Sequence, residues 1–296
     1  MSLECFSGGA AADETLKLVL FRAQIKGAFE MSEIGKQVRL SQIFNPQSHN
    51  AVIMALDHAA TLGPLLGIVD LVKTVETINE ERPETWFMPI GAIKQAYQSF
   101  IQAHIPFLLS IDTCTYMGPE PDLFFLSDTV EHAVAFGAVG VSMHALVGPS
   151  KTSEMLKGMA QVSRDCDHFG VPLLAIMYPE GFENNTDVTR VKWAARIGAE
   201  LGADTVKTYY TGSKETFQEV VESCPVPVMV SGGSKSPDPL DFLWLLRNCM
   251  DAGGRGCAVG RNVWQDKDPK AMLRAIKAIV HQGASVEEAA REIHLE

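Results

Sequence analysis

Short apolar runs recur along the chain from residue 51 onward, separated by amphipathic stretches. Runs that are apolar on both faces are typical of strands in a parallel sheet covered by helices. The pattern predicts eight strands, at Ala51–His58, Thr85–Ile90, Pro106–Asp112, Val139–Ala145, Leu173–Tyr178, Thr205–Tyr210, Val226–Ser231 and Gly256–Arg261.

Helical patterns fill the gaps between these runs. One extends from Asp187 to Leu201 and is followed by Gly202, a residue suited to the left-handed position after a helix. Residues 285–288 have the spacing of a capping box and predict a terminal helix. Another helix carries its apolar residues on one face, at Met272, Leu273, Ile276, Ile279 and Val280.

Eight strands that alternate with helices predict an α/β fold, a single (β/α)₈ TIM barrel. An open, doubly wound sheet is the rival, but eight near-regular repeats without a Pro/Gly-rich linker favour closure. We expect residues 1–44 to form a partly helical N-terminal extension and residues 45–296 to form the barrel catalytic domain. The loop Leu62–Gly67 after the first strand is placed to cover the barrel mouth.

Composition narrows the function classes. The chain has 296 residues, 46% hydrophobic and 21% charged, which is typical of a globular protein of one large domain. A formal charge of −11 argues against nucleic-acid and anionic-membrane partners, although local amides and one arginine can still bind a phosphate. Six cysteines without a C-x-x-C pair, and no visible signal peptide or spanning segment, predict a cytoplasmic protein.

Lys207 lies inside an apolar predicted strand. Burial disfavours a charged ammonium, and a neutral amine attacks carbonyl groups, so Lys207 is a candidate Schiff-base nucleophile. The alternative is a strand-end lysine whose ammonium reaches solvent. Context favours the first interpretation, because active sites of such barrels lie at the C-terminal ends of the strands.

Two further candidate catalytic residues follow other predicted strands. Tyr178 is suited to act as the acid and base that a Schiff-base reaction needs, and Asp57 is suited to orient a substrate hydroxyl and assist dehydration. A purely structural role explains each residue equally well. Tyr178 would then be an aromatic side chain that fills space before Pro179, and Asp57 would cap the turn or helix after the first strand.

Glycine-rich turns follow the last two predicted strands. Ser231, Gly232 and Gly233 end one strand, and Gly260 and Arg261 end the other, where barrels often bind phosphate. Arg261 adds a charge-assisted contact. The structural alternative to phosphate binding is that these glycines occupy tight turns that need a positive φ.

Two histidines are candidate ligands for a metal ion. His58 and His144 are ligand types suited to zinc and follow predicted strands. The remaining histidines show no ligand spacing, so the lysine chemistry ranks above a metal site.

These motifs together resemble the archaeal-type class I fructose-bisphosphate aldolase family, from about residue 38 to the C-terminus. The segments that carry the resemblance are Arg39–Pro46, Leu56–His58, Ile176–Gly181, Gly202–Thr208, Cys224–Val228, the Gly232–Gly233 turn and Val259–Gln265.

The resemblance implies a Schiff base on Lys207, an acid/base role for Tyr178 and a first-strand carboxylate at Asp57. It also implies phosphate binding by the turn glycines and Arg261, with His58 nearby in the substrate site. No metal or separate cofactor is implied, and the family tends to form ring-based homo-oligomers.

The family has branches with different substrates. One cleaves fructose 1,6-bisphosphate, one is 2-amino-3,7-dideoxy-D-threo-hept-6-ulosonate synthase, and one processes phosphorylated autoinducer-2 but lacks the tyrosine found here at Tyr178. Some aldolases proper have a tryptophan at the position of Ile176, so the segment Ile176–Pro179 of this chain is more similar to the synthase branch. Residues 59–125, however, match the synthase branch poorly. Fructose 1,6-bisphosphate is the first expectation and the synthase reaction is the alternative. A metal-dependent lyase and a non-catalytic phosphosugar-binding barrel are more distant alternatives.

Overall fold

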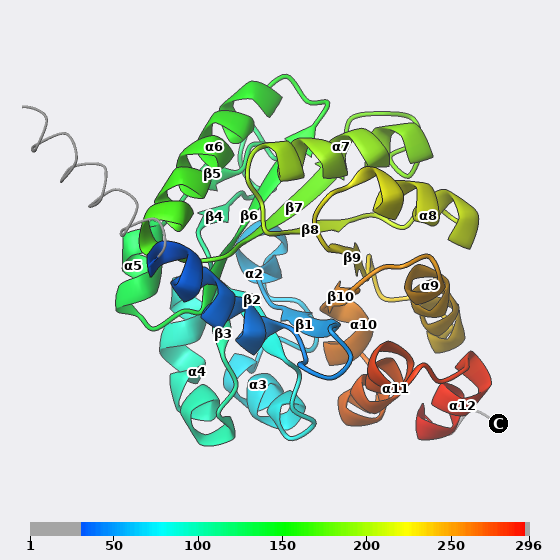
Figure 1. Ribbon diagram of the computed structural model, residues 1–296. Coiled ribbons are helices and arrows are strands. Elements are labelled where there is room, and N and C mark those ends of the chain that lie inside the picture. The colour runs from blue at the N-terminus through cyan, green and yellow to red at the C-terminus, as the bar shows by residue number, and fades with distance from the viewer. Residues whose placement is uncertain (1–30, 294–296) are drawn as a thin grey trace, which may run out of the picture.

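A computed structural model describes residues 31–293 of the chain. Eight parallel strands form a closed barrel in the order β1-β10-β9-β8-β7-β6-β3-β2 (Figure 1). This confirms the predicted TIM barrel. The barrel strands are β1 (Ala51–Ala55), β2 (Thr85–Met88), β3 (Phe107–Ser110), β6 (Gly140–Val147), β7 (Leu173–Pro179), β8 (Thr205–Thr208), β9 (Val228–Ser231) and β10 (Gly256–Val259).

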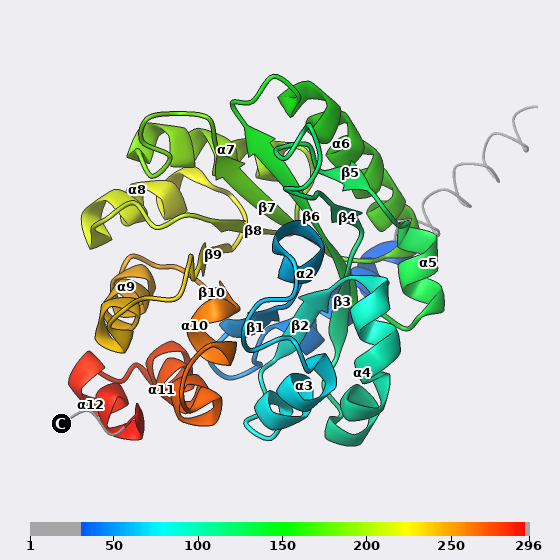
Figure 2. The same ribbon diagram turned by 180° about the vertical axis from the view of Figure 1, so that it is seen from behind.

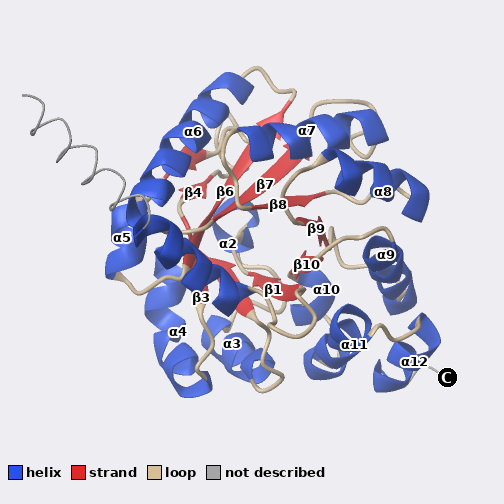
Figure 3. Ribbon diagram, viewed as in Figure 1, coloured by secondary structure: helices blue, strands red, loops and turns tan. Residues whose placement is uncertain are grey.

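Helices surround the barrel on its outside, as Figures 2 and 3 show. The predicted helix ends are confirmed: Gly202 follows its helix with a φ of +93°, and Ser285 and Glu288 form a capping box. The helices are α2 (His58–Leu62), α3 (Leu71–Asn79), α4 (Ile90–Ala103), α5 (Val130–Ala135), α6 (Thr152–Phe169), α7 (Val188–Glu200), α8 (Lys214–Ser223), α9 (Pro239–Asp251), α10 (Arg261–Trp264), α11 (Pro269–Gln282) and α12 (Val286–Ala290), followed by a 3₁₀ turn at Arg291–Ile293.

The structure differs from the sequence prediction at several strand ends. His58 and Arg261 begin α2 and α10 rather than ending strands, because the backbone turns at Asp57 and Gly260. A short antiparallel pair, β4 (Asp112–Thr113) with β5 (Phe125–Leu126), was not predicted. Strands of two residues are too short to show an alternating pattern.

The predicted loop Leu62–Gly67 begins at the last residue of α2 and continues beside α10. There, the Gln265 side-chain amide donates to the Leu66 carbonyl oxygen at 3.1 Å. None of the helices within residues 31–293 combines the length and the apolar composition that crossing a bilayer requires.

The helix at residues 31–43 closes the barrel end that faces the viewer in Figure 1. Ile43 is buried against the apolar side chains inside the barrel, including Ile53 and Leu108. Lys36 anchors the same helix, because its Nζ lies 2.7 Å from Asp167 Oδ1 and 3.2 Å from Asp204 Oδ1. Among the described residues, this helix therefore covers one end of the barrel.

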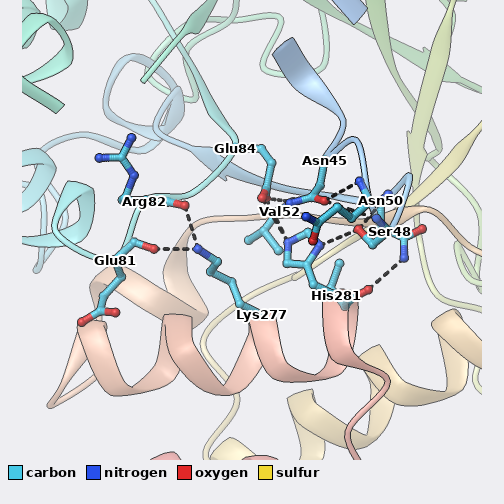
Figure 4. Close-up of polar contacts among 11 residues, drawn as sticks. Asn45, Ser48, Asn50, Val52, Glu81, Arg82, Glu84, Lys277 and His281 are labelled. Atoms are coloured by element: carbon cyan, nitrogen blue, oxygen red, sulfur yellow. Dashed lines mark hydrogen bonds and ion pairs between the residues drawn. The ribbon is translucent and has the colours of Figure 1, made fainter. Parts of the chain in front are cut away.

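A polar cluster joins the start of β1 to the end of α11 (Figure 4). Glu84 Oε2 accepts a hydrogen bond from the Val52 amide at 2.8 Å and lies 3.2 Å from His281 Nε2. Ser48 Oγ lies 2.8 Å from the other ring nitrogen of His281. The cluster lies at the N-terminal ends of the strands, where side chains of such barrels serve stability.

Gly256 is required where β10 meets β1. Its φ is +113°, and a Cβ at this position would lie 1.9 Å from the Ala51 carbonyl oxygen. We expect Gly256→Ala to lower the free energy of unfolding by more than about 3 kcal/mol, because backbone must move and the new residue is strained.

Gly91 provides the matched control for this prediction. It lies in α4, and a Cβ there would meet nothing within 4 Å. Gly91→Ala should leave stability unchanged or raise it by up to about 1 kcal/mol. Urea unfolding of both variants tests the difference, and equal stabilities would contradict it.

Candidate active site

A cavity of about 220 Å³ opens at the C-terminal ends of the barrel strands. Every residue that the sequence singled out for the site lines it except Gly232, whose carbonyl oxygen instead accepts a hydrogen bond from Asn262 at 2.6 Å. The predicted residues in the cavity wall are Asp57, His58, Tyr178, Lys207, Ser231, Gly233, Gly260 and Arg261.

Lys207 projects into this cavity from the middle of β8. The strand is buried along its whole length, as the sequence predicts, and Lys207 is only 6% exposed. Its Nζ lies 4.7 Å from the centroid of the Phe87 ring and 6.0 Å from that of Tyr178. The amine therefore faces ring surfaces inside the barrel mouth, which excludes the alternative of a lysine that reaches bulk solvent.

Tyr178 lies on the neighbouring strand, β7, with its ring stacked on Tyr209. The two ring centroids are 4.1 Å apart and the planes differ by 3°. The Tyr209 hydroxyl donates to Glu180, which also lines the cavity. Burial, with Tyr178 and Glu180 nearby, raises the pKa of Tyr209 far above its usual range, so this phenol stays protonated. Tyr178 is thus a wall of the cavity rather than an isolated plug.

Asp57 joins two histidines at the mouth. Its carboxylate oxygens lie 3.1 Å from His58 Nδ1 and 3.3 Å from His144 Nε2. Although Asp57 is the N-cap residue of α2, its side chain makes no capping hydrogen bond. Burial alone would raise the pKa of Asp57, but the adjacent imidazoles of His144 and His58 outweigh burial and hold that pKa well below its usual range.

His144 is held between two carboxylates and an aromatic ring. Its Nδ1 lies 3.1 Å from Asp112 Oδ1, its backbone amide donates to Asp112 Oδ2 at 2.6 Å, and its ring stacks on Phe124 with centroids 4.2 Å apart. Burial opposes protonation of His144, but Asp112 and Asp57 outweigh burial and raise its pKa to about 9. Burial in turn raises the pKa of Asp112, which His144 only partly offsets.

This arrangement predicts a pH-dependent stability. A histidine whose pKa rises from its usual 6.5 to about 9 on folding stabilises the fold fully below about pH 6.5. That contribution disappears as the pH rises through about 9. Urea unfolding should be measured at about pH 6 and about pH 10 for wild type and His144→Gln. Between these two pH values, the free energy of unfolding of wild type should fall by on the order of 3 kcal/mol more than that of the variant. A constant difference between the two proteins would contradict the charged His144.

The glycine-rich turns lie on the other side of Lys207, after β9 and β10. Arg261 Nη1 donates to Ser234 Oγ at 3.1 Å, and Arg261 Nε is buried without a protein partner within the described chain. A Cβ on Gly260 would lie 2.6 Å from the Ala55 carbonyl oxygen, so close packing explains this glycine. The guanidinium keeps free donors that suit an anionic group.

Sequence reasoning assigned no role to Asp112, Phe124 or Glu180, although all three line the cavity. Asp112 ends one predicted strand and Glu180 comes shortly after another, and that position was the available signal. Phe124 comes from the segment between β4 and β5, which carries no recognisable pattern. Throughout residues 31–293, no group of three or more His, Cys, Asp or Glu side chains is arranged to hold a metal ion.

Comparison with known proteins identifies the family of the chain. The sequence profile described as "DeoC/LacD family aldolase" matches residues 51–266. The chain is 33% identical over 260 residues to a 2-amino-3,7-dideoxy-D-threo-hept-6-ulosonate synthase of Halobacterium salinarum, covering 88% of this chain and 96% of that protein.

Solved structures with the same architecture include archaeal fructose 1,6-bisphosphate aldolases. One superposes with a TM-score of 0.76 at 30% identity, covering 84% of this chain and 100% of the other. A second, with its catalytic lysine covalently bound to the carbinolamine intermediate of the substrate, superposes with a TM-score of 0.76 at 29% identity, covering 83% and 99%. The chain therefore belongs to the DeoC/LacD aldolase family and is a Schiff-base-forming class I aldolase, a lyase.

Proposed function

We propose that this aldolase forms or cleaves a carbon–carbon bond in a phosphorylated ketose through a Schiff base on Lys207. The observation that carries the proposal is the buried Lys207 amine, which lies in the cavity wall with Tyr178 and Asp57. The covalent substrate–lysine bond makes a separate organic cofactor unnecessary, and no metal is needed for the steps below.

In the cleavage direction, Lys207 Nζ attacks the keto carbon of the substrate and forms a carbinolamine. Loss of water gives an iminium, which accepts the electron pair of the breaking carbon–carbon bond while the departing half becomes an aldehyde. Tyr178 removes the proton from the hydroxyl that becomes the aldehyde oxygen and later returns a proton to the enamine carbon. Hydrolysis of the iminium then releases the ketone half.

Asp57 assists the dehydration in this scheme. Its paired histidines keep it as an anion, which suits it to accept a hydrogen bond from the carbinolamine hydroxyl or from a neighbouring substrate hydroxyl. His58 supports the same group from α2.

The substrate phosphate is assigned to the turns after β9 and β10. Arg261 provides the charge, and Ser231, Gly232, Gly233 and Gly260 form the turns around it, with Gly232 behind the cavity wall. Fructose 1,6-bisphosphate is the first ketose to test, and the heptulosonate synthase reaction of the relatives is the second.

We assign catalysis to residues 45–296 and treat residues 1–44 as an N-terminal extension. The structure describes this extension from residue 31 onward. The remaining expectations are a cytoplasmic location, a ring-based homo-oligomer, and no nucleic-acid or membrane partner.

A cleavage assay tests the proposal. Triose phosphate release should be measured with phosphorylated ketoses and with unphosphorylated fructose, each with and without a chelator. We expect release from a phosphorylated ketose, little from fructose, and no loss of rate with the chelator. Chelator-sensitive turnover without inactivation by borohydride would point to a metal-dependent lyase and overturn the proposal. Binding of phosphosugar without turnover or covalent adduct would point to a binding protein.

A further inference from the structure

The cavity is unequally charged on the two sides of Lys207. In the barrel, β8 lies between β9 on one side and β7 on the other. Beyond β9, at the start of α10, lies Arg261. On the β7 side lies Glu180, and the segment after β4 adds Asp122 to the same cavity wall. A substrate that spans Lys207 therefore meets Arg261 at one end and Glu180 at the other.

Glu180 is held in place at this second end. One of its carboxylate oxygens accepts a hydrogen bond from the Tyr209 hydroxyl, and the other accepts one from the Asn185 side-chain amide. Tyr209 is in turn fixed by its stack on Tyr178. The carboxylate cannot swing away from an incoming anion without losing both hydrogen bonds.

Among the described residues that line the cavity, Lys207 and Arg261 are the only Lys and Arg side chains, and the protonated His144 is already held by Asp57 and Asp112. Two other lysines follow barrel strands, Lys235 on the Arg261 side and Lys151 on the Glu180 side, and both are already paired. Lys235 forms an ion pair with Asp266, and Lys151 lies 3.3 Å from Glu120.

We propose that Glu180 selects a ketose whose aldehyde half carries no phosphate, so that the substrate has a single phosphate, at the Arg261 end. The inference rests on the proposed Schiff-base function and names its substrate class. A second phosphate at the β7 end would meet a fixed carboxylate without a counter-charge, whereas a hydroxyl there can donate to Glu180. Glu180 is thus a specificity residue, and fructose 1,6-bisphosphate is disfavoured against fructose 1-phosphate.

The test compares kcat/KM for cleavage of fructose 1-phosphate and of fructose 1,6-bisphosphate. These ketoses differ only in the phosphate on the aldehyde half. Wild type should prefer fructose 1-phosphate by at least about tenfold, and Glu180→Gln should reduce that preference by roughly tenfold, because it removes the charge and keeps the shape.

Glu183 supplies the matched control. It is an exposed glutamate in the same loop and does not line the cavity. Glu183→Gln removes the same charge and should keep the wild-type preference. A wild type that cleaves the bisphosphate as well as fructose 1-phosphate, or a preference that is the same in Glu180→Gln as in wild type, would overturn the inference.

Borohydride trapping with dihydroxyacetone phosphate alone separates this inference from the proposed function. That ketone lacks an aldehyde half, so Glu180 has nothing to select. An absent adduct would sink the proposed Schiff base and this inference with it. A normal adduct together with equal cleavage of the two ketoses would sink only the inference about Glu180.

Discussion

Replacing Lys207 with methionine should lower turnover of a phosphorylated ketose by more than about a thousandfold, because the reaction loses its nucleophile. Methionine has a similar length and packs well against Phe87, which Lys207 already faces. The variant should therefore fold and unfold like wild type. Steady-state cleavage rates and urea unfolding together measure the two halves of this prediction.

Lys214→Met is the control for the Lys207 variant. Lys214 begins α8 and is exposed, so its loss removes the same charge outside the cavity. Its turnover should stay close to that of wild type. If Lys207→Met retained more than about a tenth of wild-type activity, a covalent lysine intermediate at this position would be ruled out.

Tyr178→Phe should lower kcat by about a hundredfold to ten-thousandfold, because the variant keeps the ring but loses the phenol that moves protons. The stack on Tyr209 should persist, since phenylalanine retains the same ring. Schiff-base formation with dihydroxyacetone phosphate should suffer less than cleavage. The measurement is the ratio of the borohydride trapping rate to the cleavage rate.

Tyr209→Phe makes the same chemical change on the other ring of the stack. The Tyr209 hydroxyl is engaged by Glu180 and stays protonated, so its loss should affect cleavage much less than the loss of the Tyr178 hydroxyl. A larger effect at Tyr209 would exchange the roles of the two tyrosines.

The fold follows from local patterns that the sequence displays openly. The run around Lys207 is apolar because β8 is covered on both faces, and the capping box at Ser285 begins α12 through contacts within four residues. Strand ends were harder to predict, since His58 and Arg261 continue apolar runs although the backbone has already turned into a helix. Turns of this kind depend on tertiary contacts, such as the packing of Gly260 on Ala55.

The candidate site was predictable where its residues follow barrel strands. Lys207, Tyr178 and Asp57 converge because parallel strands of a barrel end on the same face. The pairing of Asp57 with His144, and of His144 with Asp112, joins segments more than thirty residues apart, and no spacing rule reveals it. The hydrogen bond between Tyr209 and Glu180 likewise arises from the registration of β7 beside β8.

Mass mapping of the borohydride-reduced enzyme tests the Schiff base most directly. The protein is treated with dihydroxyacetone phosphate and borohydride, digested, and searched for a modified lysine. We predict one reduced adduct, on the peptide that contains Lys207, and none in Lys207→Met. An adduct on another lysine, or an unmodified Lys207 after treatment with every phosphorylated ketose that the enzyme turns over, would contradict the account.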